Sequence, residues 1–271
     1  MSGYFRPIRA DAFASAKPRE IFATMPGMAS TAFVAGASSG IGAAIAEALL
    51  DAGWQVALSA RRSAPLAALA ARAPRQVLAL PADLTDAAAV EALAARLRAW
   101  QPRLSALVTA AGDFFQRSLA ETTPAEFERL WRVNVLSKFL LMRELAPLLE
   151  PASAAQPPSA VIHVASLAVH QDFPDESAYA AAMYAVEGMA RSQDLELAPR
   201  GIRVAVLSPG LTRTELTERS FPPPALRGAL PPAAMAVSAL HLISTIRAGG
   251  YIAEILHLPG RGRLSAEKRQ D

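Results

Sequence analysis

Short, almost wholly apolar runs alternate along the chain with longer segments that are rich in alanine and leucine. The apolar runs have the length of strands, and unbroken apolarity is typical of parallel strands that helices cover on both faces. The predicted strands are Thr31–Ala35, Gln55–Ser59, Gln76–Leu80, Ala106–Thr109, Ala160–Ala165, Arg203–Ser208 and Ile252–Leu258. The predicted helices begin near Gly40, Pro65, Asp86, Pro124, Ser177 and Pro232. This alternation predicts an α/β fold with one doubly wound parallel sheet in a three-layer α/β/α arrangement.

One domain accounts for the whole alternating pattern, which runs from residue 30 to residue 260. Residues 1–29 lack the pattern and also lack the apolar core of a secretory signal, so we expect a flexible N-terminal extension. An ordered arm that docks on a neighbouring subunit is the alternative. Residues 261–271 read as a basic, solvated C-terminal tail. The proline-rich stretch Ser220–Pro232 is long enough to form a flap over a ligand.

The composition excludes several classes of function. The 271 residues are 52% hydrophobic, enough for a packed core, and include no cysteine, which excludes disulfides and thiolate chemistry. No apolar run reaches the roughly 18–20 residues of a membrane span. The net charge is only +3, no basic stripe is interleaved with aromatic residues, and the four histidines lack metal-ligand spacing. We therefore expect a cytoplasmic protein without a membrane, nucleic-acid or metal partner.

Three glycines follow the first predicted strand and open the first long helix. Glycine lets a backbone turn tightly and approach a pyrophosphate, and a helix N-terminus offers free N–H groups and a positive dipole end to that anion. The spacing G-x-x-x-G-x-G differs from the G-x-G-x-x-G of other dinucleotide folds, and a plain strand-to-helix turn is the alternative. We expect this Rossmann-type loop to hold cofactor phosphates through Gly36, Ser38, Ser39, Gly40, Ile41 and Gly42.

The end of the second predicted strand bears on which dinucleotide binds. An acidic residue there would hydrogen-bond the ribose 2′-hydroxyl of NAD(H), but the chain has Ala60, followed by Arg61 and Arg62. An arginine suits a 2′-phosphate, so the pattern favours NADP(H), with two surface arginines as the alternative. After the third strand, Asp83 and Leu84 are candidates to contact the adenine; Asp83 could equally cap the next helix.

Several motifs in order resemble the short-chain dehydrogenase/reductase family over about residues 30–260. The glycine loop is similar to TGxxxGxG with Ala35 in place of threonine, and "TAAG" at 109–112 is similar to NNAG without its asparagines. The segments "VNVLSKF", "VIHVASLAV" and "GIRVAVLSPGLTRTEL" complete the likeness. The resemblance implies a homodimer or homotetramer formed through helices. It also implies cofactor contacts from Ala111, Gly112, Tyr179, Pro209, Gly210 and Thr214.

The same resemblance implies an active site. Tyr179 follows Ser166 by thirteen residues, the family's interval, and would donate a proton to a substrate carbonyl while the nicotinamide delivers hydride. Ser166 would hydrogen-bond the same oxygen, and Asn134 would support the site. This chemistry is acid catalysis with stabilisation of a developing oxyanion. A Tyr179 ring that only packs in the core is the alternative.

One position departs from the family's YxxxK pattern, because Met183 stands where the lysine is expected. In the family that lysine holds the nicotinamide ribose, lowers the pKa of the tyrosine and joins a proton relay; methionine does none of these. A buried tyrosine without a cation keeps its proton, so oxidation of an alcohol should suffer more than reduction of a ketone. Lys138, one helical turn beyond Asn134, is a candidate replacement; a solvated or interface lysine is the alternative.

The sequence thus predicts NADPH-dependent reduction of a carbonyl group on a small substrate, slowed or rerouted by the missing lysine. The stretch "FPPPAL" in the proline-rich segment favours an apolar substrate. A lyase or isomerase that uses Tyr179 without net redox, and a non-catalytic NADP-binding or partner subunit, are the alternatives. Among the histidines, His163 should point away from Ser166 along its strand, and His170 in the next loop could reach a substrate.

Overall fold

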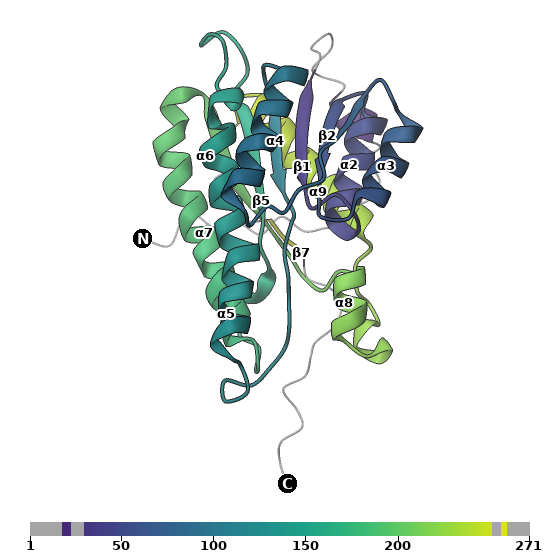
Figure 1. The fold of residues 1–271 in the computed structure, drawn as a ribbon, viewed down its shortest axis with the longest axis vertical. Helices are drawn as coiled ribbons and strands as arrows, with labels where there is room; N and C mark the ends of the chain where they lie inside the picture. Colours follow the sequence, from purple (N-terminus) through teal and green to yellow (C-terminus); the bar gives the residue numbers. More distant parts are fainter. Residues whose placement is uncertain (1–17, 23–29, 251–255, 259–271) are drawn as a thin grey trace.

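The computed structural model describes residues 18–22, 30–250 and 256–258, and a seven-stranded parallel sheet forms its centre (Figure 1). The strands are β1 (Thr31–Ala35), β2 (Gln55–Ser59), β3 (Val77–Ala79), β4 (Ala106–Thr109), β5 (Ser159–Val164), β6 (Ile202–Pro209) and β7 (Leu256–Leu258). Their order across the sheet is β3-β2-β1-β4-β5-β6-β7. The predicted α/β class is confirmed, and the first six strands lie within one residue of their predicted bounds. Of the seventh predicted strand, residues 252–255 lie outside the described residues.

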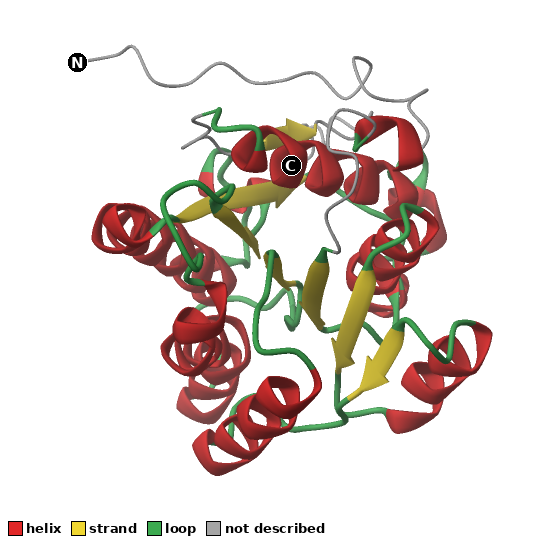
Figure 2. Ribbon diagram, turned by 90° about the horizontal axis from the view of Figure 1, so that it is seen from above, coloured by secondary structure: helices red, strands yellow, loops and turns green. Residues whose placement is uncertain are grey.

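Helices cover both faces of this sheet, which gives the expected three layers (Figure 2). The helices of the described residues are α1 (Pro18–Ile21), α2 (Gly40–Asp51), α3 (Ser63–Arg72), α4 (Ala87–Trp100), α5 (Pro124–Trp131), α6 (Ser137–Leu149), α7 (Ser177–Leu197), α8 (Glu215–Ser220) and α9 (Pro232–Arg247). The apolar faces of α4, α6 and α7 form one core with one face of the sheet, and those of α2, α3 and α9 form a second core on the other face.

Strand β1 shows why the strands read as unbroken apolar runs. Phe33 and Ala35 belong to the core beneath α4, α6 and α7, whereas Ala32 and Val34 belong to the core beneath α2, α3 and α9. Successive side chains of a strand point to opposite faces, and here both faces are dry. Apolar residues are therefore required at every position, and the alternation typical of a half-exposed strand is absent.

The order of the strands fixes where a ligand can bind. Strand β1 pairs with β2 on one side and with β4 on the other, so the connections leave it in opposite directions. In open parallel sheets, a crevice forms at such a switch point, outside the carboxyl ends of the strands. The register pairs Ala35 with both Ser59 and Thr109. The loops after β1, β2 and β4 consequently start side by side.

Part of the N-terminal extension is ordered on the domain. Helix α1 lies against α2 and α9: Arg19 Nε donates to the carbonyl of Asp51 at 2.7 Å, and Ser244 Oγ donates to the carbonyl of Ile21 at 3.0 Å. The ring of Phe22 lies 5.0 Å from that of Trp54. The expected flexible arm is therefore not what residues 18–22 form. The rest of residues 1–29 and the tail at 261–271 lie outside the described residues.

The helices differ from the prediction in two further places. Helix α6 follows α5 directly through a π-helical segment, Arg132–Leu136, and α8 is a short helix that ends at Ser220, where the proline-rich stretch begins. Within the described ranges, none of the helices combines the length and apolarity that a membrane crossing requires.

Candidate active site

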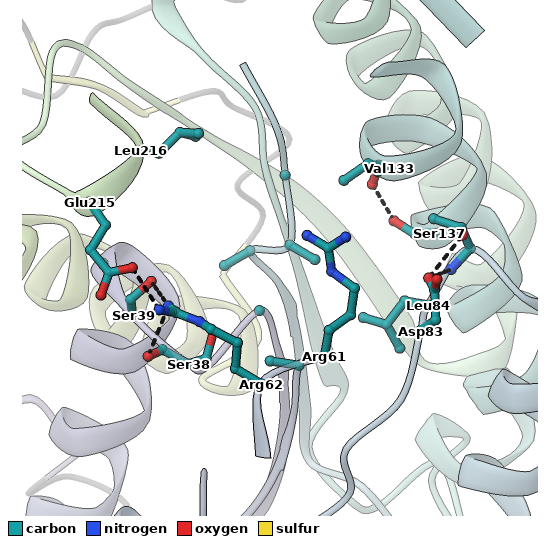
Figure 3. Close-up of a pocket in the computed structure, with 18 of the residues that line it drawn as sticks. Ser38, Ser39, Arg61, Arg62, Asp83, Leu84, Val133, Ser137, Glu215 and Leu216 are labelled. Carbon is teal, nitrogen blue, oxygen red and sulfur yellow. Dashed lines mark hydrogen bonds and ion pairs between the residues drawn. The ribbon is translucent and has the colours of Figure 1, made fainter. Parts of the chain in front are cut away.

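A cavity of about 840 Å³ opens at the carboxyl edge of the sheet (Figure 3). The loops after β1, β2, β3 and β4 form its wall together with the start of α8. Most residues that were expected to contact a cofactor line it: Gly36, Ser38, Ser39, Gly40, Ile41, Gly42, Arg61, Arg62, Asp83, Leu84, Ala111, Gly112 and Thr214. Tyr179, Pro209 and Gly210 do not belong to this lining.

Further lining residues were not singled out from the sequence. They are Ala82, Thr85, Ala110, Ala125, Glu128, Arg129, Arg132, Val133, Ser137, Glu215, Leu216 and Arg219; Ala60, the position that lacks an acidic residue, also lines the cavity. Many come from α5, the π-helical segment and α8, which reach the cavity only through the tertiary fold. Since no local pattern marks these positions, sequence reasoning had no signal by which to find them.

The glycine loop is packed so closely that side chains are excluded from it. Gly36 has φ of +84°, and a Cβ there would lie 2.4 Å from the backbone nitrogen of Ala111. A Cβ at Gly42 would lie 2.3 Å from the carbonyl oxygen of Gly36. The carbonyl of Ser59 accepts hydrogen bonds from the N–H groups of Gly36 and Ala37 at 2.7 and 3.1 Å, which fixes the loop to β2.

Helix α2 begins at this loop without a side-chain cap, because the N-cap residue Ser39 makes no capping hydrogen bond. The first N–H groups of the helix have no partners within the helix. A bare backbone cradle next to a helix N-terminus is the donor set that a pyrophosphate requires. The loop therefore fits the phosphates of a dinucleotide.

Arg62 crosses the mouth of the cavity. Its Nη2 donates to Ser39 Oγ at 2.8 Å and to Ser38 Oγ at 3.3 Å, and its Nη1 pairs with Glu215 Oε2 at 2.9 Å. Figure 3 shows this guanidinium between the glycine loop and α8, while Arg61 leaves the same turn in another direction. Half of each side chain of the Arg62–Glu215 pair is exposed, so the pair contributes little to stability. A phosphate could displace Glu215 from Arg62 at small energetic cost.

Asp83 shapes the loop after β3. Its Oδ1 accepts from the N–H and the hydroxyl of Thr85 at 2.9 and 2.8 Å, and these bonds, the backbone one first, lower the pKa of the carboxyl. Asp86, rather than Asp83, caps α4, with Ala88 N–H as its partner. Of the two predicted roles for Asp83, helix capping is therefore wrong; Asp83 lies on the cavity wall, and its contact with an adenine stays a prediction.

Ser166 and Tyr179 meet at the end of β5. Ser166 follows the strand and accepts from the N–H of Ala168 at 3.2 Å, and Tyr179 lies in the first turn of α7. Burial raises the pKa of Tyr179 to about 12; a side-chain hydrogen bond with Ser166 lowers it, and the charge of Glu176 raises it. The phenol therefore keeps its proton at neutral pH and can act as a proton donor.

Asn134 is buried in the π-helical segment between α5 and α6. Its Nδ2 donates to the carbonyl of Asp113 at 2.9 Å, and its Oδ1 accepts from the N–H of the same residue at 3.0 Å. Oδ1 also lies where a Cβ on Gly112 would approach to 2.9 Å. Asn134 thus fixes the turn after β4 that separates the cavity from Tyr179. Single π-helical turns within α-helices are frequent at functional sites.

Known proteins resemble the chain over the residues that form this site. The family model described as short chain dehydrogenase matches residues 30–224. The chain belongs to this family. Among its relatives, the rhamnolipids biosynthesis 3-oxoacyl-[acyl-carrier-protein] reductase of Pseudomonas aeruginosa is 33% identical over 189 residues, 69% of this chain and 74% of that protein. The 2,3-dihydro-2,3-dihydroxybenzoate dehydrogenase of Escherichia coli is 33% identical over 188 residues, 68% of this chain and 70% of that protein.

Solved structures agree with this assignment. The Pseudomonas aeruginosa RhlG/NADP active-site complex is 31% identical, with a TM-score of 0.78 over 87% of this chain and 97% of the other. The 3-ketoacyl-(acyl-carrier-protein) reductase of Brucella melitensis complexed with NADH is 26% identical, with a TM-score of 0.79 over 86% and 97% of the two chains. The protein is an oxidoreductase of the short-chain dehydrogenase type.

In this short-chain dehydrogenase, Met183 lies one turn after Tyr179 and is 2% exposed. It packs in the core of α4, α6 and α7, against which Tyr179 also packs. Within the described part of the chain, the groups that shift the pKa of Tyr179 are Ser166 and Glu176, and no cation is among them. An apolar side chain therefore occupies the position one helical turn after Tyr179.

Lys138, the candidate replacement, is fully buried. Its Nζ donates to the carbonyl of Ala111 at 2.8 Å, and burial lowers its pKa to about 7. Its charge acts on His163, and it does not figure among the groups that shift the pKa of Tyr179. The alternatives of a solvated or interface lysine are wrong, since the amine supports the turn after β4 from inside.

The histidines have structural partners. His163 shares hydrogen bonds with Thr109 Oγ1 at 2.7 Å and Gln193 Oε1 at 2.9 Å, and burial lowers its pKa to about 4. This histidine ties β4 and β5 to α7. His170 pairs with Glu187 at 3.0 Å. Among the described residues, no group of three or more histidines, aspartates or glutamates could hold a metal ion.

An aromatic cluster lies beside Tyr179. The Phe114 ring meets the Tyr179 ring edge-on at 4.8 Å, and the ring of Phe221, at the start of the proline-rich stretch, stacks on Phe114 at 5.4 Å. The stretch predicted to form a flap therefore reaches the catalytic end of the site through Phe221. Its contacts make the approach to Tyr179 apolar.

Proposed function

We propose that the protein is an NADPH-dependent reductase that acts on the carbonyl group of a small, apolar substrate. The observation that carries the proposal is the partly buried pair of Tyr179 and Ser166 beyond the end of β5, whose side chains share a hydrogen bond. With its pKa raised to about 12, Tyr179 is ionised in roughly one molecule in 10⁵ at pH 7. The protonated form, which reduction uses, is always present. The ionised form, which oxidation uses, is nearly absent.

The dinucleotide is inferred from the cavity. Arg61 and Arg62 line it beside Ala60, which offers no carboxylate to a ribose 2′-hydroxyl. The solved relative from Pseudomonas aeruginosa carries NADP, which supports the same choice, whereas the Brucella melitensis relative carries NADH. When bound, the nicotinamide supplies a hydride to the substrate carbon.

The chain's own residues then perform the proton chemistry. Tyr179 donates the phenolic proton to the substrate oxygen, and the Ser166 hydroxyl hydrogen-bonds the same oxygen as charge develops on it. Asn134 keeps the turn after β4 in place through its two hydrogen bonds to Asp113. Phe114 and Phe221 exclude water and favour an apolar substrate. Because Met183 cannot lower the pKa of Tyr179 or hold a ribose, turnover is expected to be slow.

A second copy of the chain is the proposed partner. Helices α5 and α6 follow one another through the π-helical segment, and this long helix lies beside α7 in Figure 1. Large apolar side chains on them are exposed: Phe127, Trp131, Phe139, Tyr184 and Leu195. Such a patch is more often an interface than a free surface, and a two-fold pair of identical faces would cover it. Sedimentation or light scattering tests this, with Phe139→Glu as the variant expected to yield monomers.

The test of the function is the oxidation of NADPH by purified protein over a panel of aldehydes and ketones of graded polarity. Turnover with NADPH, preferred over NADH and lost in Tyr179→Phe, supports the proposal. Substrate conversion without any change in nicotinamide absorbance would instead indicate the lyase or isomerase alternative. NADPH binding without turnover would indicate a non-catalytic subunit. Because the chain belongs to an oxidoreductase family, neither the lyase or isomerase alternative nor the non-catalytic alternative is favoured.

A further inference from the structure

A buried carboxyl group lies at the start of α7, beside the catalytic tyrosine. Glu176 is 7% exposed and immediately precedes the first helical residue, three positions before Tyr179. Residues three apart at the start of a helix are neighbours, and the charge of Glu176 acts on Tyr179 directly. The carboxyl is not used to cap the helix, because Glu176 makes no side-chain capping bond. Its burial therefore needs another explanation.

The backbone before Glu176 is held in an unfavourable conformation. Asp175 has φ of +62° and is the one non-glycine residue with positive φ among those that the structure describes. Its carbonyl accepts from the N–H of Arg117 at 2.7 Å, and the carbonyl of Pro174 accepts from Gln116 at 3.3 Å. This turn leaves Asp175 exposed and Glu176 buried. Such backbone strain is concentrated at functional sites.

The loop that bonds to the backbone of Asp175 carries charged groups, and these are paired with other residues. On the facing loop, Asp113 pairs with Arg129, and Arg117 pairs with Glu126. Burial is the cause that raises the pKa of Glu176, to about 7. At neutral pH this carboxyl is thus a mixture of acid and carboxylate.

Further along α7, Glu187 pairs with His170 and Arg191 and does not compensate the charge of Glu176. Of the two described glutamates with raised pKa, Glu187 lies within α7. Glu176 lies at the N-cap of the same helix, three positions before the phenol of Tyr179.

We propose that Glu176 returns the proton to Tyr179 after each reductive turnover, a task for which the chain has no lysine at position 183. The inference rests on the proposed function. In the chemical step the O–H bond of Tyr179 breaks and its proton goes to the substrate oxygen, which has received the electron pair of the transferred hydride. The O–H bond of the Glu176 acid then breaks, and its proton passes to the Tyr179 phenolate, directly or through one water. The carboxylate takes its next proton from solvent.

The direction of the proton transfer follows from the two acidities. The phenol of Tyr179 has its pKa raised to about 12 and the Glu176 acid to about 7, so the proton moves from the carboxyl to the phenolate. After the transfer, the charge of the carboxylate, which is one of the causes of the raised pKa of Tyr179, helps to hold the phenol in its protonated form. Glu176 acts through Tyr179 and does not need to touch the substrate.

The variant Glu176→Gln tests the relay, because it keeps the size of the side chain and removes its acid proton. In wild type, kcat for ketone reduction should be highest below pH 7 and fall as Glu176 ionises. In Glu176→Gln, kcat should fall about tenfold or more, within the range of proton-transfer effects, with KM nearly unchanged and without the ionisation near pH 7. The matched control is Asp175→Asn, which removes the neighbouring exposed carboxyl and should leave kcat and its pH profile intact.

A second readout does not depend on activity. Carbon-13 NMR of the glutamate side-chain carboxyls should show one group that titrates near pH 7 in wild type and is missing from Glu176→Gln. Should Glu176→Gln fail to fold, Glu176→Asp replaces it: the shorter acid should keep the ionisation but reprotonate Tyr179 more slowly. An unchanged kcat in Glu176→Asp would then count against the relay.

The outcomes separate the relay from the proposed function. If wild type is active and Glu176→Gln has the same kcat and pH profile, the proposed relay is wrong, but the proposed reductase function is not affected. A Glu176 carboxyl that titrates at an ordinary glutamate pKa also overturns the relay, since it would hold no proton at neutral pH. A wild type that is inactive on every carbonyl, with the NMR titration as expected, overturns the proposed function and the relay with it.

Discussion

The two ends of the site differ in what they depend on. At the nucleotide end, around β1, β2 and β3, the geometry is made by backbone: positive φ at Gly36, contacts too close for a Cβ, and uncapped N–H groups. At the catalytic end, around β4, β5 and α7, each step of the proposed reaction depends on one side chain. Met183 is a buried apolar side chain and Glu176 is a carboxyl group with a raised pKa, so neither has the properties of a lysine. The nucleotide end contains the glycine loop that resembles the family's pattern, whereas at the catalytic end Met183 stands where the resemblance implies a lysine. Cofactor binding and proton chemistry should therefore respond separately to substitution.

The largest effect is expected from Tyr179→Phe. Loss of the proton donor should lower kcat for carbonyl reduction by about 10²–10⁴-fold. The Kd for NADPH, measured by fluorescence, should stay within about twofold of wild type, because Tyr179 does not line the nucleotide cavity. A large loss of NADPH affinity in Tyr179→Phe would contradict the expectation that cofactor binding and proton chemistry respond separately to substitution.

Gly36→Ala is expected to act at the nucleotide end instead, where it should weaken NADPH binding. A Cβ 2.4 Å from Ala111 N, at φ of +84°, must displace the turn after β4, so NADPH affinity should fall by well over about tenfold. Gly53→Ala is the matched control: its φ is +87°, but nothing lies within 4 Å of the added carbon. It should lose about 1–2 kcal/mol of unfolding free energy from backbone strain alone and bind NADPH normally. Equal effects of the two substitutions on NADPH affinity would contradict the role of close packing.

A smaller effect is expected from Arg62→Ala. Its guanidinium already binds Ser38, Ser39 and Glu215, and a 2′-phosphate would add a charge-assisted bond. The Kd for NADPH should rise about tenfold while that for NADH changes little. Arg72→Ala, which removes an exposed arginine that pairs with Glu47 on the surface, is the control. A parallel loss of both dinucleotides would indicate a general role in phosphate binding.

The smallest effect concerns the stability of the catalytic end. The pKa of Lys138 is lowered by burial to about 7 in the folded chain, against about 10.4 in the unfolded one. Between these values the unfolded chain binds more protons, so the penalty for burying the ammonium is complete below pH 7 and disappears by about pH 10. The unfolding free energy of wild type relative to Lys138→Met should therefore rise over this window, by on the order of 1 kcal/mol or more. Urea titrations at pH 7 and pH 9 measure it; a flat difference would contradict the buried charge.

Local signals were sufficient for most of the fold. The central strands and the glycine loop could be located because their residue types are set by their immediate surroundings. Both faces of β1 are buried, and the backbone at Gly36 has positive φ. No local signal marked the residues from Arg132 to Leu136 as a π-helical turn, in which Asn134 binds the backbone of Asp113 in another part of the fold.

The burial of charged groups at the catalytic end, and their shifted pKa values, could not be predicted from the sequence for the same reason. Lys138 and Glu176 are residue types that are normally solvated, and only the packing of α6 and α7 against the sheet buries them. The pairing of Arg62 with Glu215 joins positions far apart in the chain. The sequence has Met183 where the resemblance implies a lysine, and the prediction that the tyrosine keeps its proton agrees with its raised pKa.

The central claim is that Tyr179 acts as a proton donor without a lysine, so the protein reduces carbonyls but hardly oxidises alcohols. The measurement is the initial rate in both directions at pH 7, for wild type and Met183→Lys side by side. The account predicts a wild type that reduces a carbonyl with NADPH and scarcely oxidises the matching alcohol with NADP⁺. In Met183→Lys, the new cation should lower the pKa of Tyr179 and raise the oxidation rate more than the reduction rate. A wild type that oxidises as readily as it reduces would contradict the claim.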